Sequence, residues 1–119
     1  MRREHLKNIK RMVVKIGSRV LTDDDGALDL AVIGRICSDI AEIRSTGIQV
    51  VLVSSGAVAA GRDELGLTEK LRTIPHKQAA AAIGQTRLMR AYQEALLPHG
   101  LKAAQVLLTS EDLATRQRF

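Results

Sequence analysis

The stretch IQVVLV at 48–53, in which five of six residues are aliphatic, constrains the fold of this chain more than any other stretch. Its length suits a β-strand, and its lack of polar alternation is typical of a strand that helices bury on both faces, as in a parallel sheet. A similar run at 9–17, IKRMVVKIG, precedes it and ends at a glycine. Between them, apolar residues recur at three- and four-residue steps from Leu30 to Ile43, which predicts an amphipathic helix that stops near Gly47.

The rest of the sequence continues this alternation. Helix-forming residues occupy 57–65, Gly66 interrupts them, and a second helical stretch follows at about 75–97. The run LKAAQVLL at 101–108 predicts a third strand. Strands that alternate with helices of this length favour right-handed crossovers, so we predict an α/β fold, a three-layer αβα sandwich with a mainly parallel sheet.

The last stretch of the chain predicts an unfinished helix. SEDLATRQRF at 110–119 begins with Thr109 or Ser110 as a cap and reaches Phe119 without a glycine, asparagine or proline to close the helix. We therefore expect the chain to continue, and the predicted fold to be incomplete in these residues.

Charge and composition narrow the possible functions. Residues 1–11 hold five basic residues and one acidic residue, which is +4 of the formal net charge of +5 and leaves +1 for the rest of the chain. We therefore divide the chain into a basic tail, 1–11, and a domain, 12–119. Tyr92 and Phe119 are the only aromatic residues, too few to stack nucleotide bases, so we expect no nucleic-acid partner through this region.

The single cysteine points to a reducing compartment. Cys37 has no second cysteine with which to form an internal disulfide and no Cys/His cluster with metal-ligand spacing around it, so a cytoplasmic location and no metal ligands are expected. Cys37 itself is expected to be a small hydrophobic residue within a helix. No apolar segment approaches the length that spans a bilayer, and no membrane partner is expected.

Two loops carry residues suited to anions. Lys15 lies near the end of the first predicted strand, followed by Gly17 and the hydroxyl of Ser18, while Ser55 and Gly56 follow the second strand directly before a helix. Free N–H groups at a helix start favour an anion, and the carboxyl ends of parallel strands meet at one edge of a sheet. A lone lysine near a strand end is most often a solvated surface residue, and SSG is most often a capped turn. Together, the two loops predict a phosphate and carboxylate site.

Other patterns carry less chemistry. GAVAAGRD at 56–63 lacks the lysine and the serine or threonine of a Walker phosphate loop, and no G-x-G-x-x-G fingerprint occurs. DDDG at 23–26 is typical of a charged reverse turn rather than a metal site. The small residues of KQAAAAIGQ at 77–85 indicate close helix packing, and we assign them no catalytic role.

Four segments together resemble a known family. VVKIGSRVL, VVLVSSGAVAAGRDELG, KQAAAAIGQTRLM and AQVLLTSEDL are similar, in this order, to the N-terminal motifs of the glutamate 5-kinase branch of the amino-acid kinase family. The similarity runs from Met12 through nearly the whole chain. Related kinases typically show a Gly-Gly pair after the first lysine or His-Gly-Gly at the second loop, whereas this chain has GS at 17–18 and SSG at 54–56.

The resemblance implies an enzyme and its reaction. In this family branch the γ-phosphoryl group of ATP, with Mg²⁺, is transferred to the side-chain carboxylate of L-glutamate, which gives L-glutamyl 5-phosphate in the first step of proline biosynthesis. By match of motif, Lys15 is the catalytic residue that contacts the ATP phosphates, and Gly17 and Ser18 line the phosphate loop. The residues that the same match assigns to glutamate lie in the second loop: Ser55, Gly56 and Ala57.

The resemblance also implies what these residues lack. The nucleotide-base pocket, further glutamate contacts and a second phosphate-contacting lysine fall after Phe119 in the family, so we expect this chain alone to be inactive. We also expect a homo-oligomer. Two alternatives stay open, namely another amino-acid kinase that acts on a different carboxylate or phosphate, and a non-catalytic anion-binding or interaction module.

Overall fold

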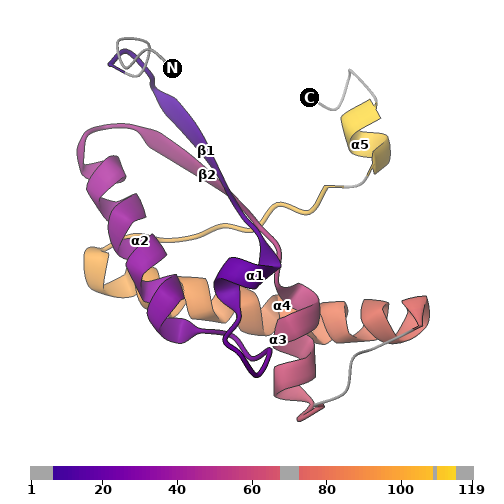
Figure 1. Ribbon diagram of the computed structural model, residues 1–119. Coiled ribbons are helices and arrows are strands. Elements are labelled where there is room, and N and C mark those ends of the chain that lie inside the picture. Colours follow the sequence, from indigo (N-terminus) through magenta and orange to yellow (C-terminus); the bar gives the residue numbers. More distant parts are fainter. Residues whose placement is uncertain (1–6, 68–72, 109, 115–119) are drawn as a thin grey trace.

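The computed structural model describes residues 7–67, 73–108 and 110–114. In these residues, strands and helices alternate as the sequence predicts (Figure 1). The elements are β1 (Arg11–Ile16), α1 (Ser18–Leu21), α2 (Leu30–Ser45), β2 (Gln49–Ser54), α3 (Ala57–Glu64), α4 (Ile74–Leu96), a 3₁₀ turn (Leu97–His99) and α5 (Ser110–Ala114). Two predicted helix ends are visible in the backbone, since Gly47 and Gly66 both adopt a positive φ where α2 and α3 stop.

The two strands form a parallel pair. The register runs from Arg11 beside Gln49 to Ile16 beside Ser54, and α2 is the connection between the strands. The Asp29 carboxylate caps α2 by accepting hydrogen bonds from the N–H groups of Ala31 and Val32. The chain thus has an incomplete αβα fold with a parallel sheet, as predicted.

Only one face of this strand pair is covered in the described residues. Ile16, Val50 and Leu52 pack against the core, whereas the side chains of the opposite face are exposed: Val13 by 65%, Val51 by 47% and Val53 by 49%. The expectation that helices bury IQVVLV on both faces is therefore wrong for this part of the chain. Periodicity alone missed this, because four consecutive apolar residues, VVLV at 50–53, give no sign of which face is covered.

The predicted third strand at 101–108 is also wrong. This segment is extended but has no ladder partner among the described residues, and Figure 1 shows it leaving α4 as a long trace toward α5. One side-chain hydrogen bond, from Gln85 Nε2 to Gln105 Oε1 at 3.1 Å, ties it to α4. A strand requires a neighbouring backbone as well as β-branched residues, and local sequence specifies only the second. Leu101 and Ala103 at its start pack against the core, whereas the apolar side chains toward its end are exposed: Val106, Leu107 and Leu108.

An aliphatic core lies between the covered face of the sheet, α2 and α4. Cys37 is fully buried in it, as expected for a small hydrophobic residue, and burial raises the pKa of its thiol. The buried members of this core are Leu21, Leu28, Ile33, Cys37, Ile40, Ala60, Leu88, Ala91, Tyr92 and Leu96.

The stretch 22–28 between α1 and α2 is a polar turn. The Asp23 carboxylate accepts the N–H groups of Asp25 at 2.9 Å and Ala27 at 3.0 Å, while Thr22 and Leu28 form an isolated antiparallel bridge. The prediction of a charged reverse turn is confirmed. The four-residue helix α1 was not predicted, because one turn of helix has no measurable periodicity.

Helices α3 and α4 cross with almost no space between their backbones. A Cβ atom added to Gly84 would overlap the carbonyl oxygen of Ala57, and one added to Gly61 would overlap the carbonyl of Ala80. The close helix packing predicted for 77–85 is therefore confirmed. Glycine is required at these two positions by contact, not by backbone conformation.

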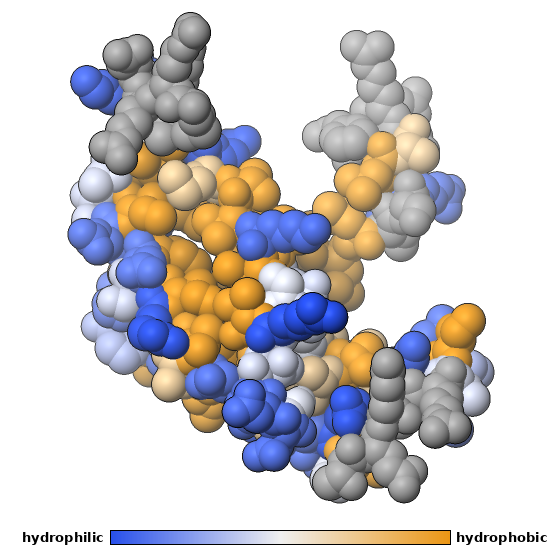
Figure 2. Space-filling view, viewed as in Figure 1, coloured by the Kyte–Doolittle hydropathy of each residue, from blue (hydrophilic) through white to orange (hydrophobic). Residues whose placement is uncertain are grey.

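The molecule has an open shape. Its radius of gyration is 16.0 Å, compared with about 13.5 Å expected for a compact domain of this length. Figure 2 shows apolar surface over the region of the strand pair. Exposed apolar residues of the two strands include Val13, Val51 and Val53. Exposed apolar surface beside open strand edges favours association with other protein surface. No helix within the described ranges is both long enough and apolar enough to cross a membrane.

Substitution of glycine by alanine should change stability in opposite directions at the helix crossing and in the middle of α2. Gly84→Ala adds a methyl group against the backbone of α3, and overpacking of this kind costs about 1–3 kcal/mol. Gly34→Ala in the middle of α2 meets no atom within 4 Å, so the higher helix propensity of alanine should stabilise the fold by about 0.5–1 kcal/mol.

The measurement is urea denaturation followed by circular dichroism at sub-micromolar concentration, where association is weakest. Gly84→Ala should lower the midpoint and Gly34→Ala should raise it. Equal shifts of the same sign in both variants would contradict the close approach of α3 and α4.

Candidate functional site

The parallel pairing brings the two predicted loops together. Ile16 lies beside Ser54 in the register, and one residue further the N–H of Ser55 donates to the carbonyl oxygen of Ile16 at 2.9 Å. The loops after β1 and β2 therefore leave the same edge of the sheet from adjacent positions. This confirms the expected juxtaposition of the loops.

Lys15 stands one residue before the end of β1. It pairs with Val53 in the register, and its side chain is exposed on the face of the sheet that the helices leave uncovered. Its ammonium group makes no hydrogen bond or ion pair with any part of the chain that the structure describes. A strand-borne cation with no internal partner is available to an external anion.

The first loop offers open backbone at Gly17. Its φ of −83° is ordinary, so the glycine is not needed for the chain to turn, but nothing lies within 4 Å of the position of a Cβ atom. Ser18 begins α1 and is exposed, and its carbonyl accepts the hydroxyl of Thr22 at 3.0 Å. Leu21, fully buried at the end of this one-turn helix, anchors the loop in the core.

The second loop turns sharply at Gly56. Its φ of +107° lies in the left-handed region, and a Cβ there would come within 3.2 Å of Leu21 Cδ1, so both conformation and space favour glycine. Ala57 begins α3 directly afterwards. Within the described residues, no hydrogen bond engages the N–H groups of Gly56 and Ala57 or the hydroxyl of Ser55. Such free donors at a helix start suit an anion.

A tyrosine beneath the second loop was not predicted as part of the site. The hydroxyl of Tyr92, on α4, lies 2.7 Å from Ser54 Oγ, and Ser54 Oγ lies 2.8 Å from the carbonyl oxygen of Ser55. Burial raises the pKa of Tyr92, and the hydrogen bond with Ser54 opposes this shift in part. Tyr92 falls within the helix predicted at about 75–97, but no sequence signal identifies its partner Ser54 in β2.

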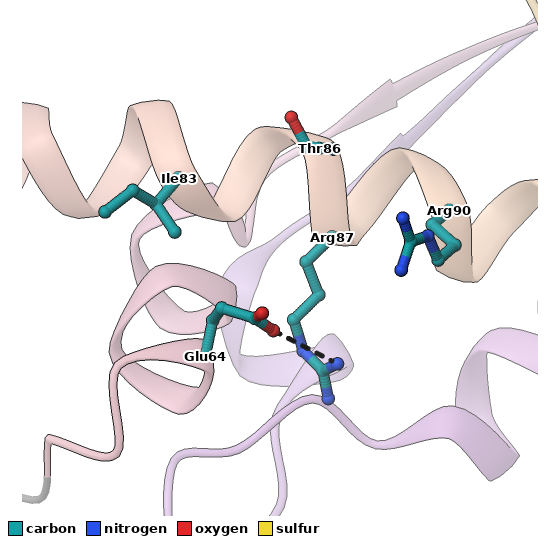
Figure 3. A pocket seen from close by; sticks show the side chains of 5 residues that line it. All are labelled: Glu64, Ile83, Thr86, Arg87 and Arg90. Carbon is teal, nitrogen blue, oxygen red and sulfur yellow. Dashed lines mark ion pairs between the residues drawn. The ribbon is translucent and has the colours of Figure 1, made fainter.

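A shallow pocket lies elsewhere, between the end of α3 and α4 (Figure 3). Arg87 reaches from α4 to the carboxylates of Asp63 at 2.8 Å and Glu64 at 3.6 Å, and Figure 3 shows it directed at Glu64. None of the predicted site residues lines this pocket, whose walls are Glu64, Ile83, Thr86, Arg87 and Arg90. These ion pairs hold α3 against α4.

The described residues contain no group of three or more His, Cys, Asp or Glu side chains that would hold a metal ion. The donors gathered at the loops are instead N–H groups, hydroxyls and one ammonium group. Such donors fit phosphate and carboxylate oxygens and do not fit a cation.

Comparison with known proteins places this geometry in a family. Residues 10–118 match the amino acid kinase family, and the chain belongs to it. The match includes both strands, both loops and the helices between them.

Close relatives share one name. The chain is 78% identical to a glutamate 5-kinase of Pelobacter propionicus, 58% identical to one of Trichlorobacter lovleyi and 57% identical to one of a Geobacter species, strain M21. In each comparison all 119 residues align, and they cover 32% of the relative. The chain therefore spans about a third of the length of these curated relatives.

Proposed function

We propose that this chain supplies the ATP-phosphate contacts and part of the glutamate contacts of a glutamate 5-kinase. Such an enzyme transfers the γ-phosphoryl group of ATP to the side-chain carboxylate of L-glutamate. The observation that carries the proposal is the hydrogen bond from Ser55 to Ile16, because it sets a cationic strand end beside a loop of free N–H donors. The shared name of the relatives favours glutamate over other carboxylates.

The first loop is the proposed phosphate side. The Lys15 ammonium has no internal partner, so it is free to neutralise charge on the ATP phosphates. Gly17 leaves open space through which phosphate oxygens reach backbone, and the exposed hydroxyl of Ser18 adds a donor. The kinase family implies ATP, and Mg²⁺ would come bound to its phosphates, since the described residues hold no cluster for it.

The second loop is the proposed glutamate side. The Ser55 hydroxyl and the N–H groups of Gly56 and Ala57 are hydrogen-bond donors that no described residue uses. Three donors along one turn suit the carboxylate oxygens of an amino acid.

No general base is required for this transfer. A carboxylate with a reference pKa of about 4.3 is already ionised at neutral pH and attacks phosphorus directly. The difficulty is to bring one anion up to another, so catalysis depends on positioning and on positive potential at the phosphates. The exposed cation and the free N–H groups described above are groups of this kind.

We further propose a cytoplasmic location, a homo-oligomer and a domain that begins at residue 12. The buried single cysteine is compatible with a reducing compartment. The uncovered apolar face of β1 and β2 offers surface for contact with further protein.

The proposal is best tested in a chimera. These 119 residues replace the aligned residues of the P. propionicus relative, which supplies the remaining two thirds of the protein. Glutamate-dependent ATP turnover should match that of the unmodified relative. A folded chimera without this turnover would defeat the proposed function.

Removal of the Lys15 ammonium should mainly slow turnover. In the chimera, Lys15→Ala should lower kcat by at least about a hundredfold, the scale of losing one preorganised charge donor. Lys10→Ala, which removes a lysine just before β1, is the matched control and should change kcat little. Near-normal kcat in Lys15→Ala would remove Lys15 from the mechanism.

Removal of the Ser55 hydroxyl should separate the two substrates. Ser55→Ala in the chimera should raise the KM for glutamate about tenfold or more and leave the KM for ATP nearly unchanged, since a hydrogen bond to a charged group contributes about 1.5–3 kcal/mol. Steady-state kinetics with each substrate varied in turn measure both constants. Equal increases in both would assign the loop to the nucleotide instead.

The 119-residue chain alone should show no glutamate-dependent ATP turnover. Transition-state stabilisation requires all contributing groups to be held in place, and the face of the strand pair that carries Lys15 is uncovered in the described residues. A coupled assay on the purified chain measures this, with Lys15→Ala as the control for contaminating kinases. Turnover that disappears in Lys15→Ala would show that these residues contain a complete site.

A further inference from the structure

A chain of two hydrogen bonds runs from the core to the second loop. The Tyr92 hydroxyl lies 2.7 Å from Ser54 Oγ, and Ser54 Oγ donates to the carbonyl oxygen of Ser55 at 2.8 Å. A serine hydroxyl has a single proton, so Ser54 has none left for Tyr92. Tyr92 is therefore the donor in the first bond, and the two bonds point in one direction, from α4 toward the loop.

The tyrosine is suited to this role by its surroundings. Tyr92 is 4% exposed and lies within the apolar core, where burial raises the pKa of its hydroxyl above the ordinary value of 10.0. It therefore keeps its proton throughout the neutral range and remains a donor. Burial among aliphatic side chains also fixes the ring, so the position of its oxygen is fixed as well.

The last bond in this chain orients a peptide plane. A trans peptide is planar, with its C=O and N–H pointing in opposite directions. When Ser54 Oγ holds the carbonyl of Ser55, the N–H of Gly56 is turned away from Ser54. No described residue accepts a hydrogen bond from this N–H. The positive φ of Gly56 then turns the chain directly into α3.

We infer that Tyr92 is a positioning residue for substrate binding, which acts through Ser54 to aim the N–H of Gly56 at the glutamate carboxylate. This inference rests on the proposed function, because it takes glutamate as the ligand of the loop. Tyr92 itself touches no substrate. Its contribution is to hold one peptide plane in the orientation that binding requires. Glutamate binding then does not have to pay the entropy of ordering that peptide.

A purely structural role for the hydroxyl makes a different prediction. A buried tyrosine normally finds a hydrogen-bond partner, and satisfying that need alone would affect stability and not the binding of one substrate over the other. The ratio of the two KM values therefore distinguishes positioning from structural support.

The central experiment is Tyr92→Phe in the chimera, which removes one oxygen and keeps the ring. The KM for glutamate should rise about three- to tenfold, the scale of one hydrogen bond, while the KM for ATP changes less than about twofold. Ser54→Ala should raise the KM for glutamate at least as much, and Ser54→Thr, which keeps the hydroxyl, should restore it. The double variant Tyr92→Phe with Ser54→Ala should be no worse than Ser54→Ala alone, since one break already interrupts the chain of bonds.

The matched control is Cys37→Ala. Cys37 is fully buried and close enough to influence the pKa of Tyr92, but it makes no bond in this chain. Its truncation should lower the melting temperature and leave the KM for glutamate unchanged.

The failures of the two proposals differ. An unsubstituted chimera that folds without glutamate-dependent turnover defeats the proposed function. An active chimera in which Tyr92→Phe leaves the KM for glutamate unchanged, or raises both KM values equally, overturns the positioning role and leaves the proposed function standing.

Discussion

The parallel pairing of β1 with β2 is the constraint on which the site depends. Its last backbone bond, from Ser55 to the carbonyl of Ile16, forms beyond the end of the ladder and fixes the relative position of two loops that lie far apart in sequence. Without that bond, the exposed ammonium of Lys15 and the free N–H groups at the start of α3 would be unrelated features, each common in proteins. With it, one cation and several donors converge on the same edge of a sheet, where α/β proteins bind ligands.

The close contact of α3 and α4 helps to fix the position of the second loop at this edge. Because Gly61 and Gly84 carry no side chains, α4 approaches the backbone of α3 directly, from Ala57, the residue after the turn at Gly56, onward. The same helix then continues to Tyr92, two turns beyond Gly84, which reaches back to Ser54 at the end of β2. One long helix therefore contacts the segments on both sides of the turn, and the second loop is held between its two contacts.

Sequence alone predicted the two strands, the longer helices and the two loops, but it failed where a partner outside the local segment decides the outcome. Helix boundaries such as Gly47 and Gly66 follow from backbone conformation, which is a local property. The run at 101–108 has the composition of a strand, yet pairing needs a second backbone that the described residues do not place beside it. The bond between Ser54 and Tyr92 joins residues 38 positions apart, so no spacing rule finds it. Which residues approach one another across the fold is set by packing, and single-sequence patterns contain little of that information.

The exposed face of the strand pair connects the open shape with the chemistry. In a parallel register, paired residues share a face, so Lys15 lies on the same side as its partner Val53, and Val13 lies two residues before it on β1. The attraction between a cation and a phosphate is weak in bulk water and becomes stronger when water is excluded. Protein surface laid over this face would bury exposed valines and, at the same time, lower the dielectric around the Lys15 ammonium. Covering that face would therefore bury exposed apolar surface and, in the same physical change, strengthen the attraction between the ammonium of Lys15, the residue proposed to contact phosphate, and a bound anion.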